Sequence, residues 1–387
     1  MEVSAYVLFA IGPLVGNAVL VLLGAIASDF SVDPTQVLIS VPAFMIPFAS
    51  VQLFSGAISD IRGRIPVILF GLVFYGIGLL LVSVSPSLSF FIWGYALAGF
   101  GFGFVNPVLI ALITDYSSQS EIQGKMGITG ALATTMVGLG PAIAGQMVIY
   151  GWRVFYGTFV IIAFFVAAIL GLSRPENRRV ETEHALVNLI RTFSEELKRP
   201  AVLLMMLSGF LISASYGGIT VWTSRGLTGA FLPSIVGGVL MLLGVTGLTA
   251  GLSINRIVTR FGERTALGLG MLSLFTSLVL LISIGDITQQ ASLVLVALAV
   301  LILGWAAGSL SPVVLATSQK LSPGRRGALA GLLTFSMFVG NAVVPIFYEP
   351  FFTFGMRSVY SAIMVVSVFL LFTLYAFTRK ASQQLDI

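Results

Sequence analysis

The stretch GAISDIRGR (residues 56–64) places one acid and two arginines between two long apolar runs. The chain has 387 residues, of which 57% are hydrophobic and only 9% are charged. Soluble domains carry about a quarter charged residues, so this composition excludes a soluble globular protein. In such a chain, a group of charges marks a place where the polypeptide leaves an apolar environment.

Apolar runs separated by short polar breaks follow one another along the whole chain. A bilayer core about 30 Å thick requires about 20 apolar residues per spanning helix. Each run meets that length, and the first, which begins close to Met1, is too long for a signal-peptide core and is expected to be retained. The sequence therefore predicts an all-α integral membrane protein with twelve transmembrane helices, over residues 5–28, 35–59, 65–84, 88–113, 126–149, 154–173, 201–222, 231–254, 265–285, 291–316, 327–348 and 358–377.

The basic residues indicate the orientation. If both termini are cytoplasmic, only Arg153, Arg225 and Arg357 lie in outer loops, and the other seventeen of the 20 basic residues lie inside. This bias obeys the positive-inside rule. It explains the net charge of +5 better than a nucleic-acid surface, which would gather the charge on one soluble face. We expect a protein of the cytoplasmic membrane with both ends inside.

Catalytic and metal-binding patterns are missing from the sequence. It has no cysteine, and its one histidine, His184, lies in a charged loop. No set of residues has the spacing of metal ligands, and no Ser/His/Asp arrangement is expected around an apolar pocket. We therefore expect no metal, no cofactor and no enzymatic activity.

The longest polar stretch, residues 174–200, divides the chain into two hydrophobic parts. Within it Leu186, Leu189, Ile190, Phe193 and Leu197 recur at helical spacing, with Glu195, Glu196, Lys198 and Arg199 elsewhere on the wheel. We predict a six-helix bundle over residues 1–173, a cytoplasmic linker with an amphipathic helix over 174–200, and a second bundle over 201–387. A disordered tether is the alternative for the linker.

The two hydrophobic parts resemble copies of each other. GFGFGFVNPVLIA begins at Gly99 and GWAAGSLSPVVLA begins at Gly304, and five identities align at one offset of 205 residues. Gly140 also matches Gly340, and Arg153 matches Arg357, with small changes in loop length. Parallel repeats of this kind characterise transporters in which two bundles rock around a site at mid-membrane. The two bundles are therefore predicted to be pseudo-symmetric.

The opening stretch resembles the loop signature of the major facilitator superfamily, G-x-x-x-D-x-x-G-R, at Gly56, Asp60, Gly63 and Arg64. The resemblance implies that the acid and the arginine hold the two bundles together on the cytoplasmic side in one state of the transport cycle. Asp115, near the inner end of the fourth span, is placed to pair with Arg64. Asp60 is expected to face the N-terminus of the span that begins near residue 327, where the helix dipole favours an anion. The two glycines are expected to allow close helix approach and a tight turn.

GLGPAIAG (residues 138–145) resembles the G-P-x-x-G-G signature of exporters in the drug/proton antiporter branch of this superfamily. It carries Gly138, Gly140, Pro141 and Gly145. GWRVF, which follows at residue 151, is also typical of the branch. The resemblance implies a twelve-span multidrug efflux antiporter that works by alternating access, and it covers nearly the whole chain.

Several positions depart from these signatures. Tyr95 stands where the branch carries an arginine linked to proton coupling, and Thr259 stands where the second-half copy of the loop signature would carry its acid. Four more departures are Ile61, Ile65, Met136 and Ala144. Asp, Glu, Lys and Arg are also missing from the middle of every predicted span, where they are costly and usually functional. We therefore expect weak or absent strict proton coupling, with any coupling at a helix-end acid such as Asp29, Asp33 or Glu349.

In this superfamily the first, fourth, seventh and tenth spans line the cavity. Polar and aromatic residues at mid-depth could orient a neutral, amphipathic or weakly cationic substrate. The alternatives for such residues are helix-to-helix hydrogen bonding and lipid contact. The cavity candidates are Asn17, Gln52, Tyr95, Asn106, Gln146, Tyr216, Trp305 and Asn341.

Three kinds of function fit these patterns. The first is a secondary active exporter of small hydrophobic or amphipathic molecules. The second is a facilitator or importer of a neutral metabolite such as a sugar or nucleoside, and the third is a non-transporting receptor or assembly factor. The expected partners are a small-molecule substrate, membrane lipids and, for an antiporter, protons. Nucleic acid is not expected, and the protein is expected to be a monomer.

Overall fold

The computed structural model describes residues 2–118, 121–172 and 185–385. In these ranges the chain consists of helices joined by short connections and forms no β-strand. Twelve of the described helical segments are long and apolar enough to cross a membrane. The prediction of an all-α protein with twelve membrane spans is confirmed.

The chain divides into two compact units, Met1–Ile190 and Arg191–Ile387. The boundary falls inside α8 (Ala185–Glu196), a helix within the segment predicted as a linker. Residues 173–184, including His184, lie outside the described part of the chain. The treatment of 174–200 as a separate domain stays a prediction.

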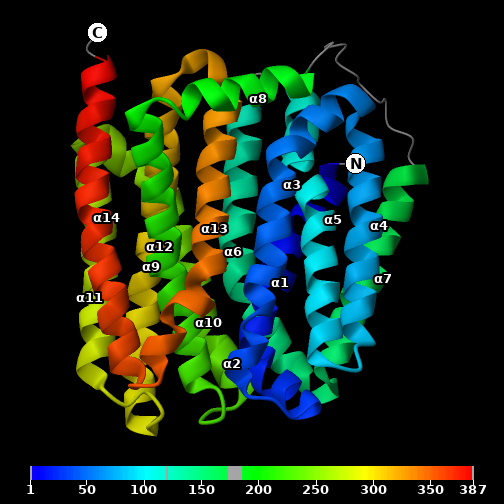
Figure 1. Cartoon of the computed structure of the whole chain (residues 1–387), viewed down its shortest axis with the longest axis vertical. Coiled ribbons are helices and arrows are strands. Elements are labelled where there is room, and N and C mark those ends of the chain that lie inside the picture. Colours follow the sequence, from blue (N-terminus) through cyan, green and yellow to red (C-terminus); the bar gives the residue numbers. More distant parts are fainter. Residues whose placement is uncertain (1, 119–120, 173–184, 386–387) are drawn as a thin grey trace. The chain divides into compact units, whose positions relative to one another are not determined.

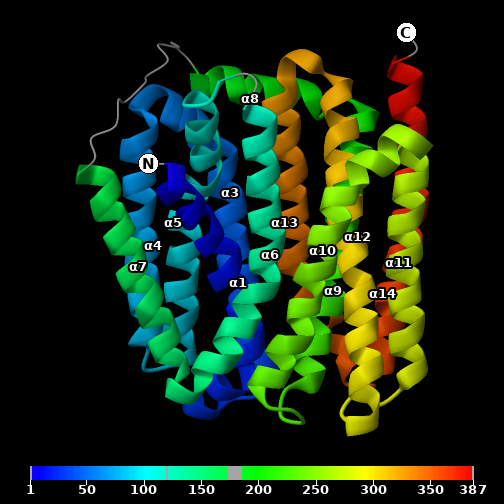
Figure 2. The same ribbon diagram turned by 180° about the vertical axis from the view of Figure 1, so that it is seen from behind.

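The first unit contains six spans, of which the second is broken in two. Its helices are α1 (Glu2–Phe30), α2 (Pro34–Val37), α3 (Ser40–Arg62), α4 (Arg64–Ser83), α5 (Leu88–Asp115), α6 (Ile122–Met147), the short 3-10 helix η1 (Val148–Tyr150) and α7 (Trp152–Leu172). Figures 1 and 2 both show α4, α5 and α7 side by side.

The second unit repeats the series with six long helices. They are α9 (Pro200–Leu227), α10 (Pro233–Phe261), α11 (Glu263–Ile284), α12 (Leu293–Leu321), α13 (Arg326–Phe352) and α14 (Met356–Leu385), with 3-10 turns η2 (Gln290–Ser292) and η3 (Pro323–Arg325) at either end of α12. The second half of α8 belongs to this unit and runs across the direction of α9 and α12 (Figure 1).

Most of the observed helices are longer than the predicted apolar runs. The run predicted to end at 254 continues as α10 to Phe261, and the run predicted to end at 316 continues as α12 to Leu321. Hydropathy marks where the chain leaves hydrocarbon, whereas a helix continues wherever its backbone bonds remain satisfied. The predicted run 35–59 is instead interrupted between Val37 and Ser40, because Pro42 has no N–H for the carbonyl of Leu38 and its ring opposes a continuous helix there.

Within each unit the fourth span is central. In the first unit α5 packs against α3 and α4, and α1 packs against α6. In the second unit α12 packs against α10 and α11, and α9 packs against α13. The two units thus share the main packing pairs of their spans, as a duplication requires.

The duplicated glycines explain this packing. A Cβ on Gly99 of α5 would overlap the carbonyl oxygen of Phe44 in α3. A Cβ on Gly304 of α12 would lie 2.5 Å from the carbonyl oxygen of Leu243 in α10. Without a side chain at these positions, two helix backbones can touch directly. The predicted equivalence of Gly99 and Gly304 therefore extends to equivalent helices and equivalent contacts.

Candidate functional site

Arg64, the first residue of α4, holds the ends of three helices together. Its NH1 atom lies 2.5 Å from Asp60 Oδ1 and donates to Ser59 Oγ at 2.6 Å. Its Nε donates to Asp115 Oδ2, at the end of α5, at 2.9 Å. Only 12% of the Arg64 side chain is exposed. A mostly buried guanidinium that donates hydrogen bonds to carboxylates on two helices interacts with them more strongly than the partners of a solvated surface ion pair interact with each other. Ser59, Asp60, Arg64 and Asp115 form what we call the first ion cluster.

The two glycines of the loop signature behave differently. Gly63 has φ 92° and ψ 153°, a backbone conformation that favours glycine, and it separates α3 from α4. At Gly56, no described atom lies within 4 Å of the place that a Cβ would occupy. The expectation that Gly56 permits close helix approach is wrong in this structure. Its carbonyl instead accepts from Ser59 Oγ at 2.7 Å, and sequence reasoning missed that buried serine.

The second unit holds an ion pair in the equivalent place. Gly262 repeats the turn of Gly63, with φ 85° and ψ 163°, and Glu263 follows it as the first residue of α11. Lys320 Nζ, near the end of α12, lies 2.5 Å from Glu263 Oε1. Thr317 Oγ1 donates to Glu263 Oε2 at 2.9 Å. Glu263, Thr317 and Lys320 form the second ion cluster.

The signs of the charges are exchanged between the two clusters. Glu263 occupies the position of Arg64, and Lys320 occupies that of Asp115. The sequence carried the signal, because Asp115 and Lys320 differ by the same 205 residues as Gly99 and Gly304. The prediction for this part of the chain concerned the missing acid at Thr259 and did not include this pair.

Duplicated arginines cap the opposite ends of the bundles. Arg153, near the start of α7, donates to the carbonyl oxygen of Ser85 at 2.9 Å. Arg357, near the start of α14, donates to the carbonyl oxygen of Ile282 at 3.1 Å. Each accepting carbonyl lies two residues from the end of its unit's third span, Ser85 after the end of α4 and Ile282 before the end of α11. Arg153 also pairs with Asp29 of α1, so the first unit adds a charge pair to the shared backbone contact.

The exporter-like stretch of α6 packs against α1. A Cβ on Gly140 would overlap the carbonyl oxygen of Leu14, and Gly138, Pro141 and Gly145 are also buried. Gly340 of α13 makes the corresponding approach to Phe210 of α9. Gly140 and Gly340 therefore allow the first and fifth spans of their units to pack closely.

Tyr95 does not line a cavity. Its side chain is 2% exposed, and its hydroxyl lies 2.6 Å from the hydroxyl of Tyr156 in α7. Its ring stacks on Phe91 and meets the edge of Phe44. The prediction for Tyr95 is wrong because this face of α5 forms the core of the first unit.

The other cavity candidates differ in how their polar groups are used. Asn17 Nδ2 donates to the carbonyl oxygen of Pro13 in its own helix at 2.8 Å, and Asn341 packs directly on Gly217 of α9. The buried Oδ1 of Asn106 has no hydrogen-bond partner among the described residues, which makes it the strongest remaining candidate. Gln146 is exposed, and the half-buried candidates are Asn17, Gln52, Asn106, Tyr216, Trp305 and Asn341.

These features define an integral membrane protein of twelve spans, in two units that share their packing and an ion cluster at equivalent helix ends. The chain belongs to the Major Facilitator Superfamily, whose sequence model matches residues 5–345. Members of this superfamily are membrane transporters.

Individual relatives are distant. An uncharacterised MFS-type transporter of Bacillus subtilis, YceJ, is 25% identical over 357 residues, which cover 89% of this chain and 87% of the relative. A bicyclomycin resistance protein homolog of Haemophilus influenzae is 28% identical over 65% of each chain. This relative is consistent with the drug/proton antiporter branch. The crystal structure of a mutant of the nucleoside transporter NupG matches with a TM-score of 0.72 at 13% identity, over 98% of this chain and 99% of that one, and so shares the fold.

Proposed function

We propose that this protein is a secondary active transporter that exports small hydrophobic or amphipathic molecules across the cytoplasmic membrane, with both termini in the cytoplasm. The observation that carries the proposal is the exporter-like stretch of α6, residues 138–145. The exporter-like stretch supplies Gly140, which packs on the backbone of α1 at Leu14. The similarity to a bicyclomycin resistance protein homolog supports the same direction of transport.

The substrate class follows from the side chains within the spans. Ionisable residues are missing from the middle of the spans in the sequence, so a strongly charged substrate would have no buried counter-charge. Asn106, Tyr216 and Trp305 offer amide, hydroxyl and aromatic groups. Such groups orient an apolar ring or attract a weak cation. We infer a neutral, amphipathic or weakly cationic substrate.

The first ion cluster is proposed as a latch of alternating access. Asp60, Arg64 and Asp115 hold the ends of α3, α4 and α5 at fixed positions. A tenfold change in the ratio of two conformations requires only about 1.4 kcal/mol. Charge-assisted contacts at a partly exposed site are of that order, so a latch of this size can bias the cycle without blocking it.

The test of export is transport by the purified protein in proteoliposomes, with a panel of weakly cationic and neutral amphipathic compounds, a nucleoside and a sugar. We expect saturable transport of amphipathic compounds and none of the nucleoside or sugar. Transport of the sugar or nucleoside alone would contradict the proposal and favour a facilitator of a neutral metabolite. Absence of any transport would favour a receptor or assembly factor.

The latch has a separate test with a matched control. Asp60→Asn removes one charge from the first ion cluster, and we expect it to reduce transport while the protein remains folded. Glu121→Gln removes the charge of an exposed acid that lies 3.8 Å from Lys125 Nζ, and is expected to leave transport unchanged. Equal transport in the wild type and Asp60→Asn would contradict the latch and would mean that Asp60 is an ordinary charged residue of a loop.

A further inference from the structure

A buried carboxylate lies where the linker helix enters the second unit. Glu196 is the last residue of α8, and only 2% of its side chain is exposed. The sequence placed Glu196 on the polar side of this helix, where a glutamate would be solvated. Burial of a carboxylate is costly unless other groups pair with it and donate hydrogen bonds to it.

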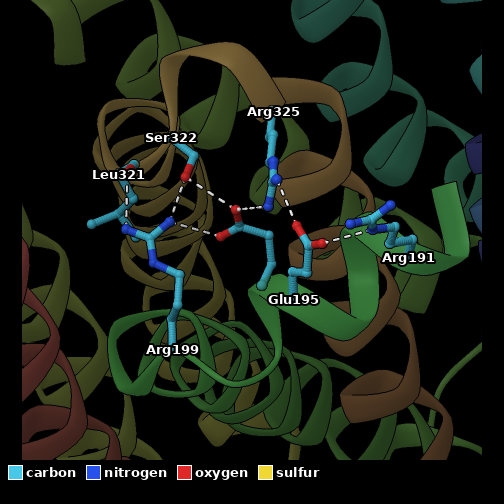
Figure 3. A network of polar contacts seen from close by, with 7 residues as sticks. Arg191, Glu195, Arg199, Leu321, Ser322 and Arg325 are labelled. Carbon is cyan, nitrogen blue, oxygen red and sulfur yellow. Dashed lines mark hydrogen bonds and ion pairs between the residues drawn. The ribbon is translucent and has the colours of Figure 1, made fainter. Parts of the chain in front are cut away.

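Three donors from two other segments contact this carboxylate: Arg199, Ser322 and Arg325, which Figure 3 labels. Arg199 NH1 lies 2.8 Å from Glu196 Oε2. Arg325 NH1 and Ser322 Oγ both lie 3.2 Å from Glu196 Oε1. Arg199 precedes α9, whereas Ser322 and Arg325 belong to the connection between α12 and α13. One carboxylate therefore joins the linker helix, the start of α9 and the α12–α13 connection.

Arg199 also reaches the end of α12. Its NH2 donates to the carbonyl oxygen of Leu321, the last residue of that helix, at 3.1 Å, and its NH1 donates to Ser322 Oγ. A cation at a helix C-terminus is favoured by the exposed carbonyl groups there. The arginine therefore ties the start of the unit's first span to the end of its fourth span.

A second carboxylate extends the contacts outward. Arg325 NH2 lies 2.6 Å from Glu195 Oε2, and Arg191 Nε lies 3.0 Å from Glu195 Oε1. The hydrogen bonds from Arg191 and then Arg325 lower the pKa of Glu195, and the hydrogen bonds to Glu195 and Glu196 raise the pKa of Arg325. Both groups therefore stay charged at neutral pH. We call this set the linker clamp, and it comprises Arg191, Glu195, Glu196, Arg199, Leu321, Ser322 and Arg325.

We propose that Glu196 is a positioning residue of the transport cycle, which through the linker clamp makes the end of the linker helix, the start of α9 and the α12–α13 connection move as one body. The first and fourth spans of a unit are the ones expected to face the substrate in this superfamily. Coupling their ends would transmit a displacement of α9 to α12. This role rests on the proposed transport function, but the clamp itself can be tested without a substrate.

The test uses a thiol reporter in the α12–α13 connection. The sequence has no cysteine, so Gly324→Cys introduces a single thiol. Gly324 is exposed, and no described atom lies within 4 Å of the place that a Cβ would occupy there. Thr259→Cys, on the exposed end of α10, provides a reporter in the same unit outside the clamp. The rate of labelling by a water-soluble maleimide reports how often each site opens.

We expect Glu196→Gln to speed labelling of the thiol at position 324 about tenfold, which corresponds to about 1.4 kcal/mol of local opening. Labelling of the thiol at position 259 should stay within about twofold, and transport of a compound that the wild type moves should fall. Glu121→Gln, a control outside the clamp, should change neither labelling rate. Unchanged labelling at position 324, or an equal rise at both reporters, would overturn the proposal, because the first shows no clamp and the second shows general loosening.

A milder variant covers the case in which Glu196→Gln does not fold. Arg325 is 42% exposed, and Arg325→Gln leaves the contacts of Glu196 with Arg199 and Ser322 in place. We expect a smaller rise in labelling, at position 324 only, and the lack of any rise contradicts the clamp. If the wild type transports no compound of the panel, the export proposal fails, whereas the labelling rates still decide whether the clamp exists.

Discussion

Single glycines decide how closely the helices of each unit approach one another. A methyl group on Gly99 would overlap the backbone of Phe44, and a backbone carbonyl cannot rotate away as a flexible side chain does. Overpacking of this kind typically costs about 1–3 kcal/mol. We therefore expect Gly99→Ala to lower the thermal unfolding midpoint of the purified protein in detergent.

Gly157 of α7 is the matched control for this substitution. It is also a helical glycine, but no described atom lies within 4 Å of the place that a Cβ would occupy there. Alanine at such a site stabilises a helix by about 0.5–1 kcal/mol. Gly157→Ala should therefore raise the midpoint or leave it unchanged. A Gly99→Ala protein as stable as Gly157→Ala would show that α3 and α5 are not in direct backbone contact.

Glu195 gives the linker clamp a pH dependence. Its pKa lies below the ordinary value of 4.5, first because Arg191 and then because Arg325 donate to the charged form. A group with a lowered folded pKa stabilises the fold above its unfolded pKa, and this contribution is lost as the pH falls through the folded value. We expect Glu195→Gln to have a lower unfolding midpoint than the wild type at about pH 7. The difference should disappear once the pH lies well below the lowered pKa of Glu195, and a difference that grows on acidification would contradict the assignment.

Residue identity alone predicted some residues of the site and missed or misplaced others. The loop signature pointed to Asp60, Arg64 and Asp115, which lie together in the structure, because a rare acid and arginine at helix ends have few other partners available. It could not reveal Ser59, since a buried serine looks like any other small residue of a span. Tyr95 was predicted to line a cavity and Glu196 to lie on the polar side of its helix, and both are buried. Hydropathy describes one helix at a time, whereas the burial of a side chain depends on which neighbouring helix covers it.

At the scale of elements, the two ion clusters join the third span to the fourth in both units. In the first unit the cation is on α4 and the anion on α5, whereas in the second the anion is on α11 and the cation on α12. The same two helix ends are thus in contact in both units, with charges of opposite sign. A pair that can be exchanged in sign acts through attraction between the helices rather than through one particular residue.

This inference predicts the outcome of a charge swap in the second unit. Lys320→Glu places two acids together and should lower the unfolding midpoint. The double variant Glu263→Lys with Lys320→Glu should recover most of the loss. The pair is partly exposed, with side chains 52% and 24% accessible, so its coupling should be about 0.2–1 kcal/mol. A double variant no more stable than Lys320→Glu would mean that the two side chains do not interact.

Spans were easier to predict than their ends. Twelve apolar runs sufficed to place the helices, because only a helix satisfies its own backbone in hydrocarbon. The extension of α10 to Phe261 and the break before Ser40 depend on local backbone bonding, which hydropathy does not measure. The exchanged pair has a different signal, the 205-residue offset between Asp115 and Lys320, which hydropathy does not use.

At the scale of the whole molecule, the internal repeat is the feature that sequence and structure share most fully. Equivalent glycines contact equivalent helices, and equivalent arginines cap equivalent spans. The units differ at the ends where these arginines lie, because Asp29 joins Arg153 in the first unit. Trp152 Nε1 also donates to Asp29 at 2.8 Å. Asp29 is thus held by two donors, Arg153 and Trp152.

The contacts of Asp29 in the first unit affect which acid can take part in proton coupling. Strict antiport needs an acid that binds and releases a proton in each cycle, and the middle of the spans supplies no ionisable residue in the sequence. The helix-end acids considered for this role are Asp29, Asp33 and Glu349. Asp29 is held by Arg153, and Asp33 caps α2 by accepting from the Thr35 N–H at 2.7 Å. Glu349, exposed on α13, is therefore the best placed of the three.

We predict that transport carries no fixed proton ratio, and that any dependence on a pH gradient is reduced by Glu349→Gln more than by Asp29→Asn or Asp33→Asn. The reason is that a carboxylate which already accepts structural hydrogen bonds must weaken those contacts each time it takes up a proton. The measurement is simultaneous substrate and proton flux in proteoliposomes, with the wild type and the three single variants compared at equal protein amounts. A constant proton-to-substrate ratio that survives removal of each acid would place the coupling group elsewhere and would overturn the view that the spans lack one.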